Sequence, residues 1–256
     1  MEFEQLIRIV GDEPVFETGF LLAGNANSKD VILQLSRWTK AGRFHQIRRG
    51  LYALATPYQK VKPHPFLVAN RMVRASFVSC QSALEFHGLI PEHTPAVVSV
   101  TTSRPGRWKT PLGDFEFRHI KKELFSGYQL SDLGVGQKAF VATPEKALLD
   151  VVYLQPGGDA ESYLNELRLK NLEKLDIASL QLLAAKSRSP KLVRAVKQIA
   201  TMVGKEAEEY RTFQNPGSLN FIVTSPVSLS TVIPFPLVMS SLPVAILNMP
   251  FKNCIP

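Results

Sequence analysis

The chain has 256 residues, 45% of them apolar, which is enough material for one or two packed cores and argues against disorder throughout. The net charge of +8 is unevenly spread: residues 1–27 carry five acids against Arg8, residues 28–74 carry ten cations against Asp30, and residues 75–211 carry 18 cations against 16 acids. Attraction to a polyanion is therefore expected on one segment, and nucleic acid is the first candidate. A solvated charged face is the simpler alternative.

The cysteines and the first residues indicate a cytoplasmic protein. Cys80 and Cys254 are far apart, and neither has a metal-type neighbour at ligand spacing, which is typical of a reducing compartment. The start MEFEQLIRIV carries acids and no long apolar run, so no secretory signal is expected.

Three helices are predicted before residue 42. Apolar residues at 3, 6, 7 and 10 predict a first helix, residues 15–23 a short second one, and residues 29–41 a third that begins after the N-cap Ser28 and ends at Gly42. On the third helix the expected inner stripe is Val31, Ile32, Leu35 and Trp38. The expected outer stripe is Lys29, Leu33, Gln34, Arg37 and Lys40.

A two-stranded ribbon is predicted next. RFHQI and LYALA favour extended structure, and Arg49-Gly50 between them supplies a tight turn. Three helices followed by such a ribbon predict a winged helix-turn-helix domain over residues 1–58.

A linker marked by prolines spans about residues 56–63, and a mixed α/β domain is predicted over 64–210. Its expected strands cover 95–102, 113–120 and 139–143. Its expected helices cover 64–74, 79–87, 159–170, 172–186 and 190–209, and one more helix is expected to begin at Thr143-Pro144-Glu145. The expected fold class is α+β.

The end of the chain differs in composition. Between residues 212 and 256 Lys252 is the only charged residue, and seven prolines interrupt short apolar pieces. No piece approaches the roughly 20 residues of a spanning helix. Residues 211–256 are interpreted as an atypical tail, poorly ordered or non-native in sequence; a strand-swapping or partner-docking segment is the alternative.

The basic residues suit a DNA duplex. A helix with an apolar inner face and a cationic outer face can enter the major groove, where Arg and Gln pair with base edges, while ribbon arginines contact phosphates. The candidate DNA-binding residues are Ser28, Lys29, Gln34, Arg37, Lys40, Arg43, Arg48 and Arg49. If about five cations neutralise phosphates, log affinity falls with log salt at a slope of about −4 to −5. A winged helix that binds protein is the alternative.

The segment SRPGRWKTPLG, residues 103–113, is expected to be a loop. Its Arg104, Arg107 and Lys109, interleaved with Trp108, could form a secondary contact with phosphates or with a protein. An ordinary hairpin loop with Trp108 folded onto the core is equally compatible with the sequence.

Catalytic and cofactor signals are weak, so no catalytic residue, metal or cofactor is predicted. The five histidines include no pair at metal spacing, and GVGQ at 134–137 lacks the lysine of a phosphate loop. His119 is expected to be half-buried and Asp150 to lie on the surface, although Asp132 and Asp150 could pair. An enzyme would need a polar cluster around His87, His119 and an acid.

Several segments resemble the AbiEi family of antitoxins from type IV toxin–antitoxin systems. They are RWTKAGRFHQIRRGLYALA, SCQSALEFHGLIPEHTPAVVSVTT, TPLGDFEFRHIKKELFSGY and VATPEKALLDVVYL, in the family's order within residues 3–210. The resemblance implies a repressor that binds promoter inverted repeats through its winged helix, and a second domain that counters a nucleotidyltransferase-like toxin without a stable complex. The DNA-reading role would fall on the helix with Arg37 and Lys40 and on the Arg48-Arg49 turn. The tail departs from the family's helical ending.

Overall fold

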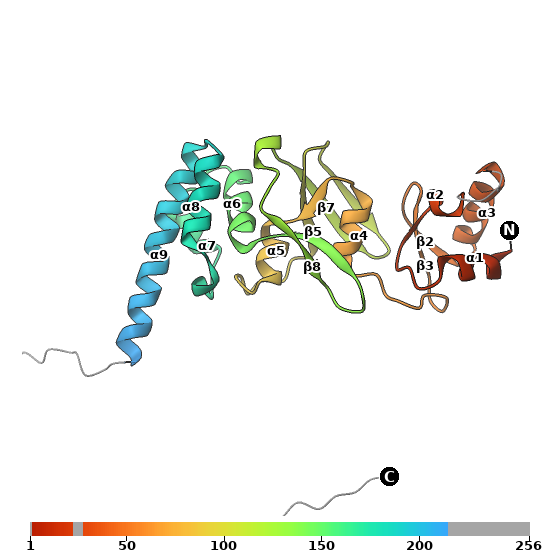
Figure 1. The fold of residues 1–256 in the computed structure, drawn as a ribbon, viewed down its shortest axis with the longest axis horizontal. Coiled ribbons are helices and arrows are strands. Elements are labelled where there is room, and N and C mark those ends of the chain that lie inside the picture. Colours follow the sequence, from red (N-terminus) through yellow and green to blue (C-terminus); the bar gives the residue numbers. More distant parts are fainter. Residues whose placement is uncertain (1, 23–27, 215–256) are drawn as a thin grey trace, which may run out of the picture. The chain divides into compact units, whose positions relative to one another are not determined.

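The computed structural model describes residues 2–22 and 28–214, and side chains up to residue 206 (Figure 1). This part of the chain contains helices and two β-sheets, which confirms the predicted α+β class. The described residues form one compact unit. Two hydrophobic clusters lie within it: a small one formed by N-terminal residues, and a larger one that joins Val15, Ile47, Leu51 and Ala53 to buried residues from Val68 onward.

The N-terminal segment alternates helices and strands in an order compatible with a winged helix. Its elements are α1 (Phe3–Val10), β1 (Phe16–Glu17), α2 (Thr18–Leu21), α3 (Ser28–Lys40), β2 (Phe44–Arg48) and β3 (Leu51–Leu54). The strands form an antiparallel sheet in the order β1-β3-β2. The predicted second helix over 15–23 is shorter than expected because its first residues pair with β3 as β1.

The predicted ribbon turn is present. Arg49 and Gly50 connect β2 to β3, and Gly50 has φ +81°, a left-handed conformation that glycine adopts without the steric cost of a Cβ. Gly42 lies in the turn after α3 and also has a left-handed conformation, with φ +72°. These glycines fix where the helix stops and where the ribbon reverses.

Aromatic residues fill the N-terminal cluster. The Phe3 ring of α1 lies 5.4 Å from the Trp38 ring of α3, and the Phe44 ring of β2 lies 6.0 Å from that of Trp38. Leu6 and Leu35 are fully buried between these elements. This packing fixes which face of α3 is turned inward.

The second sheet is mixed. Its strands are β4 (Ser76–Val78), β5 (Ala96–Thr101), β6 (Gly106–Thr110), β7 (Gly113–His119), β8 (Tyr128–Asp132) and β9 (Lys138–Ala142). Their order is β6-β7-β5-β4-β9-β8, with β4/β9 and β5/β7 parallel and the other pairs antiparallel. The predicted strands correspond to β5, β7 and β9; β4, β6 and β8 were not predicted.

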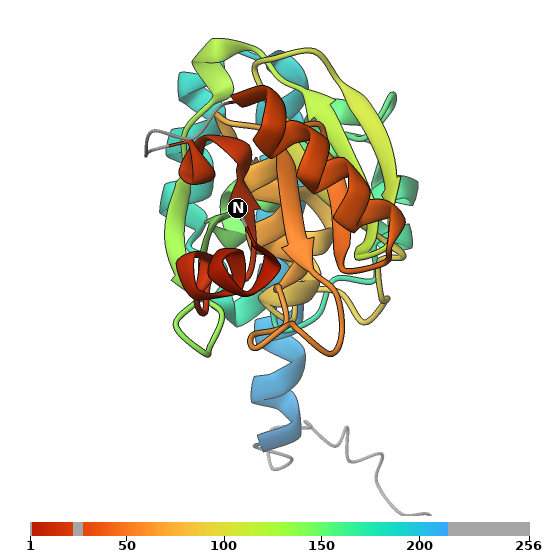
Figure 2. The ribbon, with the colours of Figure 1, turned by 90° about the vertical axis from the view of Figure 1, so that its right-hand side faces the viewer.

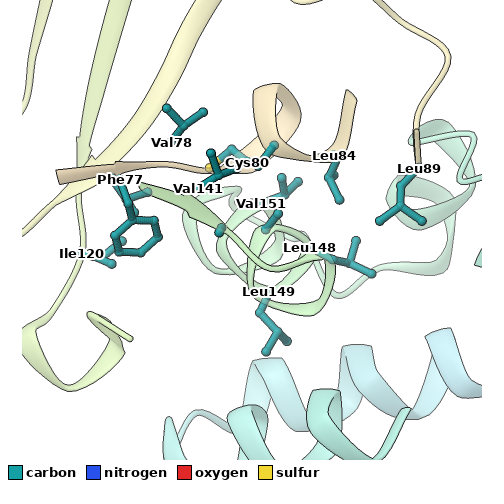
Figure 3. Close-up of a cluster of buried hydrophobic side chains, with 14 of the residues drawn as sticks. Phe77, Val78, Cys80, Leu84, Leu89, Ile120, Val141, Leu148, Leu149 and Val151 are labelled. Atoms are coloured by element: carbon teal, nitrogen blue, oxygen red, sulfur yellow. The ribbon is translucent and has the colours of Figure 1, made fainter. Parts of the chain in front are cut away.

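Helices surround this sheet and continue beyond it (Figure 1). They are α4 (Pro65–Met72), α5 (Cys80–Phe86), α6 (Pro144–Leu154), α7 (Glu161–Glu166), α8 (Ile177–Lys186) and α9 (Pro190–Gln214), with 3-10 turns at Lys122–Leu124 and Leu172–Lys174. Thr143 is the predicted N-cap of α6, and its hydroxyl accepts a hydrogen bond from the Lys146 amide at 3.3 Å. Figure 3 shows α6 contributing Leu148 and Val151 to the core beside Val141 of β9.

The GVGQ segment has a structural role. The buried Gln137 side chain accepts a hydrogen bond from the His64 amide at 2.8 Å and donates one to the Lys62 carbonyl at 2.9 Å. It thereby ties the end of the linker to the turn between β8 and β9. Residues 211–214 of the predicted tail belong to α9, and the rest of that prediction, 215–256, lies outside the described residues.

Candidate nucleic-acid interface

Helix α3 presents a cationic edge to solvent. Val31 and Leu35 are buried and Trp38 is half-buried, while Arg37 and Lys40 are exposed. Figure 2 shows α3 running across the foreground of the N-terminal segment. Lys29, Ser28 and Ser36 are exposed on the same helix. None of the described residues covers Arg37 or Lys40, so this edge is accessible to a partner.

Two predictions for α3 need correction. Ile32 was placed on the inner stripe but is 55% exposed, and Gln34 was placed on the outer stripe but is half-buried. Leu33 is 51% exposed, as its position on the outer stripe requires. The surface of α3 therefore combines cations with two neighbouring aliphatic side chains.

Arg43 packs against an aromatic ring of the N-terminal segment. Its guanidinium carbon lies 4.5 Å from the centroid of the Phe3 ring, and the residue is half-buried. A cation over an aromatic face is attracted by the quadrupole of the ring. Arg43 therefore helps to hold α1 against the start of β2, which is a different task from the predicted phosphate contact.

The arginines of the ribbon turn face another set of cations. The Arg48 guanidinium donates to the Met72 carbonyl at the end of α4. Arg48 and Arg49 line a cleft together with Arg71, Arg74 and Arg104, and no residue of α3 lines it. The structure thus separates the predicted residues into three groups: those of α3, Arg43 over the Phe3 ring, and Arg48 and Arg49 in this cleft.

The predicted loop at 103–113 contains a strand instead. Residues 106–110 pair with β7 as β6, because the alternating Arg107, Trp108 and Lys109 suit an edge strand. Trp108 packs on Phe117, with ring centroids 5.2 Å apart. Arg107 forms a 3.1 Å ion pair with Glu116, so of the three predicted secondary contacts only Arg104 joins the cleft.

The histidines named as enzyme candidates bind backbone carbonyls. A His87 ring nitrogen lies 2.8 Å from the Ala142 oxygen, and a His119 ring nitrogen lies 3.0 Å from the Ser103 oxygen. His119 is exposed, contrary to the prediction, because it is the last residue of β7, beyond the buried Phe115 and Phe117. Neither histidine is bonded to an acid in the part of the chain that the structure describes.

A buried polar cluster was not predicted from the sequence. Asp150, expected on the surface, is 1% exposed; it pairs with Lys146 one turn earlier on α6 and accepts a 2.7 Å hydrogen bond from the Ser79 hydroxyl. Burial raises the pKa of the Asp150 carboxyl, and Lys146 and Ser79 oppose that shift in part.

The neighbouring Cys80 has a backbone conformation found at some nucleophiles. Its φ is +53° at the junction of β4 and α5, but the side chain is fully buried, and burial together with the Asp150 charge raises the pKa of the thiol. A protonated, inaccessible thiol is a poor nucleophile. The cluster of Ser79, Lys146 and Asp150 has a structural role, because the hydrogen bond from Ser79 to Asp150 joins the end of β4 to α6.

The remaining acids provide no metal centre among residues 2–22 and 28–206. No group of three His, Cys, Asp or Glu side chains there could hold an ion. Asp132 and Asp150 have different partners: the Asp132 carboxylate accepts a 2.7 Å hydrogen bond from the Gly134 amide, whereas Asp150 binds Lys146 and Ser79. No described helix is long and apolar enough to cross a bilayer.

Comparisons with protein families and with curated proteins found no relative. No family model matches the chain, and no curated protein matches it. The resemblance to AbiEi antitoxins therefore stays a prediction from the sequence segments.

Proposed function

We propose that this chain is a DNA-binding transcriptional repressor that regulates its own type IV toxin–antitoxin operon and acts as the antitoxin. The observation that carries the DNA-binding part is the exposed cationic edge of α3, with Arg37 and Lys40, on an N-terminal segment whose order of elements is compatible with a winged helix. In that fold the helix before the ribbon is the one that enters the major groove.

The mechanism is steric. Helix α3 docks in a major groove, where the Arg37 guanidinium can donate two hydrogen bonds to the O6 and N7 atoms of guanine. Lys40, in the last turn, holds a phosphate and sets the orientation of the helix. Leu33, one turn before Arg37 on the same face of α3, can contact a thymine methyl group. A repressor bound in this way blocks access to the promoter.

The ribbon has a smaller part in this interface than the sequence suggested. Arg43 lies over Phe3, and Arg48 is bonded to Met72. Both would have to leave protein partners before contacting phosphates. The antitoxin role rests on the resemblance and falls within residues 64–210; its partner would be a nucleotidyltransferase-like toxin.

The proposal is tested by binding to a duplex that carries the inverted repeats upstream of the chain's own gene. Arg37→Ala is expected to weaken binding to that duplex by about 5- to 150-fold, and binding to a random duplex much less, because a lost base contact costs about 1–3 kcal/mol. Fluorescence anisotropy with both duplexes measures the difference.

Lys186→Ala is the matched control. Lys186 is exposed at the end of α8, and its loss removes the same charge from a site outside the interface. Equal weakening of both duplexes by Arg37→Ala and Lys186→Ala would mean that net charge alone drives binding. The specific docking of α3 would then be abandoned.

A protein-binding module is the second candidate, and the adjacent exposed side chains of Ile32 and Leu33 favour it. Neighbouring apolar side chains are unfavourably exposed to water unless a partner covers them. If Leu33→Ser leaves affinity for both duplexes intact but abolishes a complex with another protein, the edge of α3 serves a protein contact.

A further inference from the structure

A cleft lined by arginines lies beside the ribbon turn. Its volume is about 660 Å³, within the usual range of small-molecule sites, about 300–1,000 Å³. Its walls are formed by β1, the turn between β2 and β3, the end of α4 with the residues after it, and the loop before β6 together with Trp108 of that strand. The charged residues on these walls are Glu17, Arg48, Arg49, Arg71, Arg74 and Arg104.

The described residues do not balance the charges in this cleft. Among them Glu17 is the only acid on its walls, and its carboxylate is paired with Arg74 at 2.9 Å. Arg49, Arg71 and Arg104 have no ion-pair partner among the residues that the structure describes. Guanidinium groups gathered around one cavity repel one another unless an anion lies between them. Several phosphate groups in a row would meet this need, because each arginine can bind a phosphate with two parallel hydrogen bonds.

An aromatic side chain forms part of the same wall. The Trp108 ring lies across the backbone of Gly106, where an added Cβ would come within 2.5 Å of it, and packs edge-on against Phe117. These contacts fix the orientation of the ring while the residue stays half-buried. A fixed indole at the border of a cationic cleft is a stacking surface for a planar base.

We propose that this cleft binds a nucleoside triphosphate, with the phosphates among Arg49, Arg71 and Arg104 and the base against Trp108. The concave shape favours a small ligand over a duplex, because the cations approach from separate walls toward a shared space, whereas duplex contacts lie along an extended surface. The proposal is independent of DNA binding by α3, since no residue of α3 lines the cleft.

Calorimetric titration of the full chain with ATP, inorganic tripolyphosphate and adenosine tests both parts of the site. ATP is expected to bind, and tripolyphosphate to bind about 5- to 150-fold more weakly, because it lacks the stacked base. Adenosine alone is expected to show no measurable binding. Arg104→Ala and Arg71→Ala are each expected to weaken ATP binding by about 10- to 100-fold, because each removes a charge-assisted contact.

Lys109→Ala is the matched control, since Lys109 lies on β6 next to Trp108 but outside the cleft. It should leave ATP affinity unchanged. Absence of ATP binding, or equal losses in Lys109→Ala and Arg104→Ala, would overturn the proposal. Tripolyphosphate that binds as tightly as ATP would overturn the nucleoside part. A duplex that depends on Arg71 and Arg104, in a chain that does not bind ATP, would assign the cleft to DNA instead.

Discussion

Lys146→Met is expected to lower the free energy of unfolding by about 3–5 kcal/mol, because it leaves the buried Asp150 without its cationic partner. Methionine has a similar length and is apolar, so the loss reports the missing charge more than a cavity. Chemical denaturation of the full chain measures the change. Lys197→Met removes an exposed lysine of α9 and should change stability by no more than about 0.5 kcal/mol.

The pH dependence of this variant has a definite sign. Burial already raises the pKa of Asp150 in the folded chain, and removing Lys146 raises that pKa further. An acid whose folded pKa exceeds its unfolded value binds more protons in the folded state, so stability falls as pH rises from the unfolded pKa through the folded one. The deficit of the variant should therefore be smaller at about pH 5 than at about pH 8. An equal deficit at both pH values would contradict an electrostatic role for Lys146 beside the buried Asp150.

Leu35→Ala is expected to cost about 2–5 kcal/mol, because Leu35 is 0% exposed at the centre of the small N-terminal cluster. Leu33→Ala is its matched partner: the same atoms are removed two residues earlier on the same helix, from a side chain that is 51% exposed. This second variant should change stability by about 0.5 kcal/mol or less.

In a Trp108→Phe background Trp38 is the only tryptophan, and its fluorescence during denaturation follows the cluster to which Leu35 belongs, since Trp38 packs against it. Comparable losses in the two variants would contradict the orientation of α3 that places Arg37 and Lys40 outward. That comparison therefore tests the position of the interface without any ligand.

Local patterns predicted where α1, α3, β2 and β3 lie, because caps, glycine stops and apolar spacing act within a few residues. They did not predict the burial of every residue on α3. Val31 and Ile32 are both compatible with an inner stripe, and the choice between Ile32 and Gln34 depends on how α1 and β2 pack against the helix. Contacts with residues distant in sequence therefore determine which of these two side chains is the more buried.

The same limit applies to charged residues. Lys146 and Asp150 are spaced like a surface pair on a helix, and they are buried because α5, α8 and α9, which are distant in sequence, pack against α6. Arg48 is bonded to a carbonyl 24 residues away, and Arg104 reaches the same cleft from a more distant loop. A run of arginines in the sequence shows that cations are available, but their partners follow from the fold.

The central claim, that the edge of α3 binds DNA, is tested most directly by the salt dependence of affinity for the duplex with the inverted repeats. With Arg43 and Arg48 engaged in protein contacts, two or three phosphates neutralised by α3 give a slope of about −2 to −3 in log affinity against log salt. Lys40→Ala should make that slope shallower by about one. A slope near zero, or one that Lys40→Ala leaves unchanged, would contradict the proposed interface.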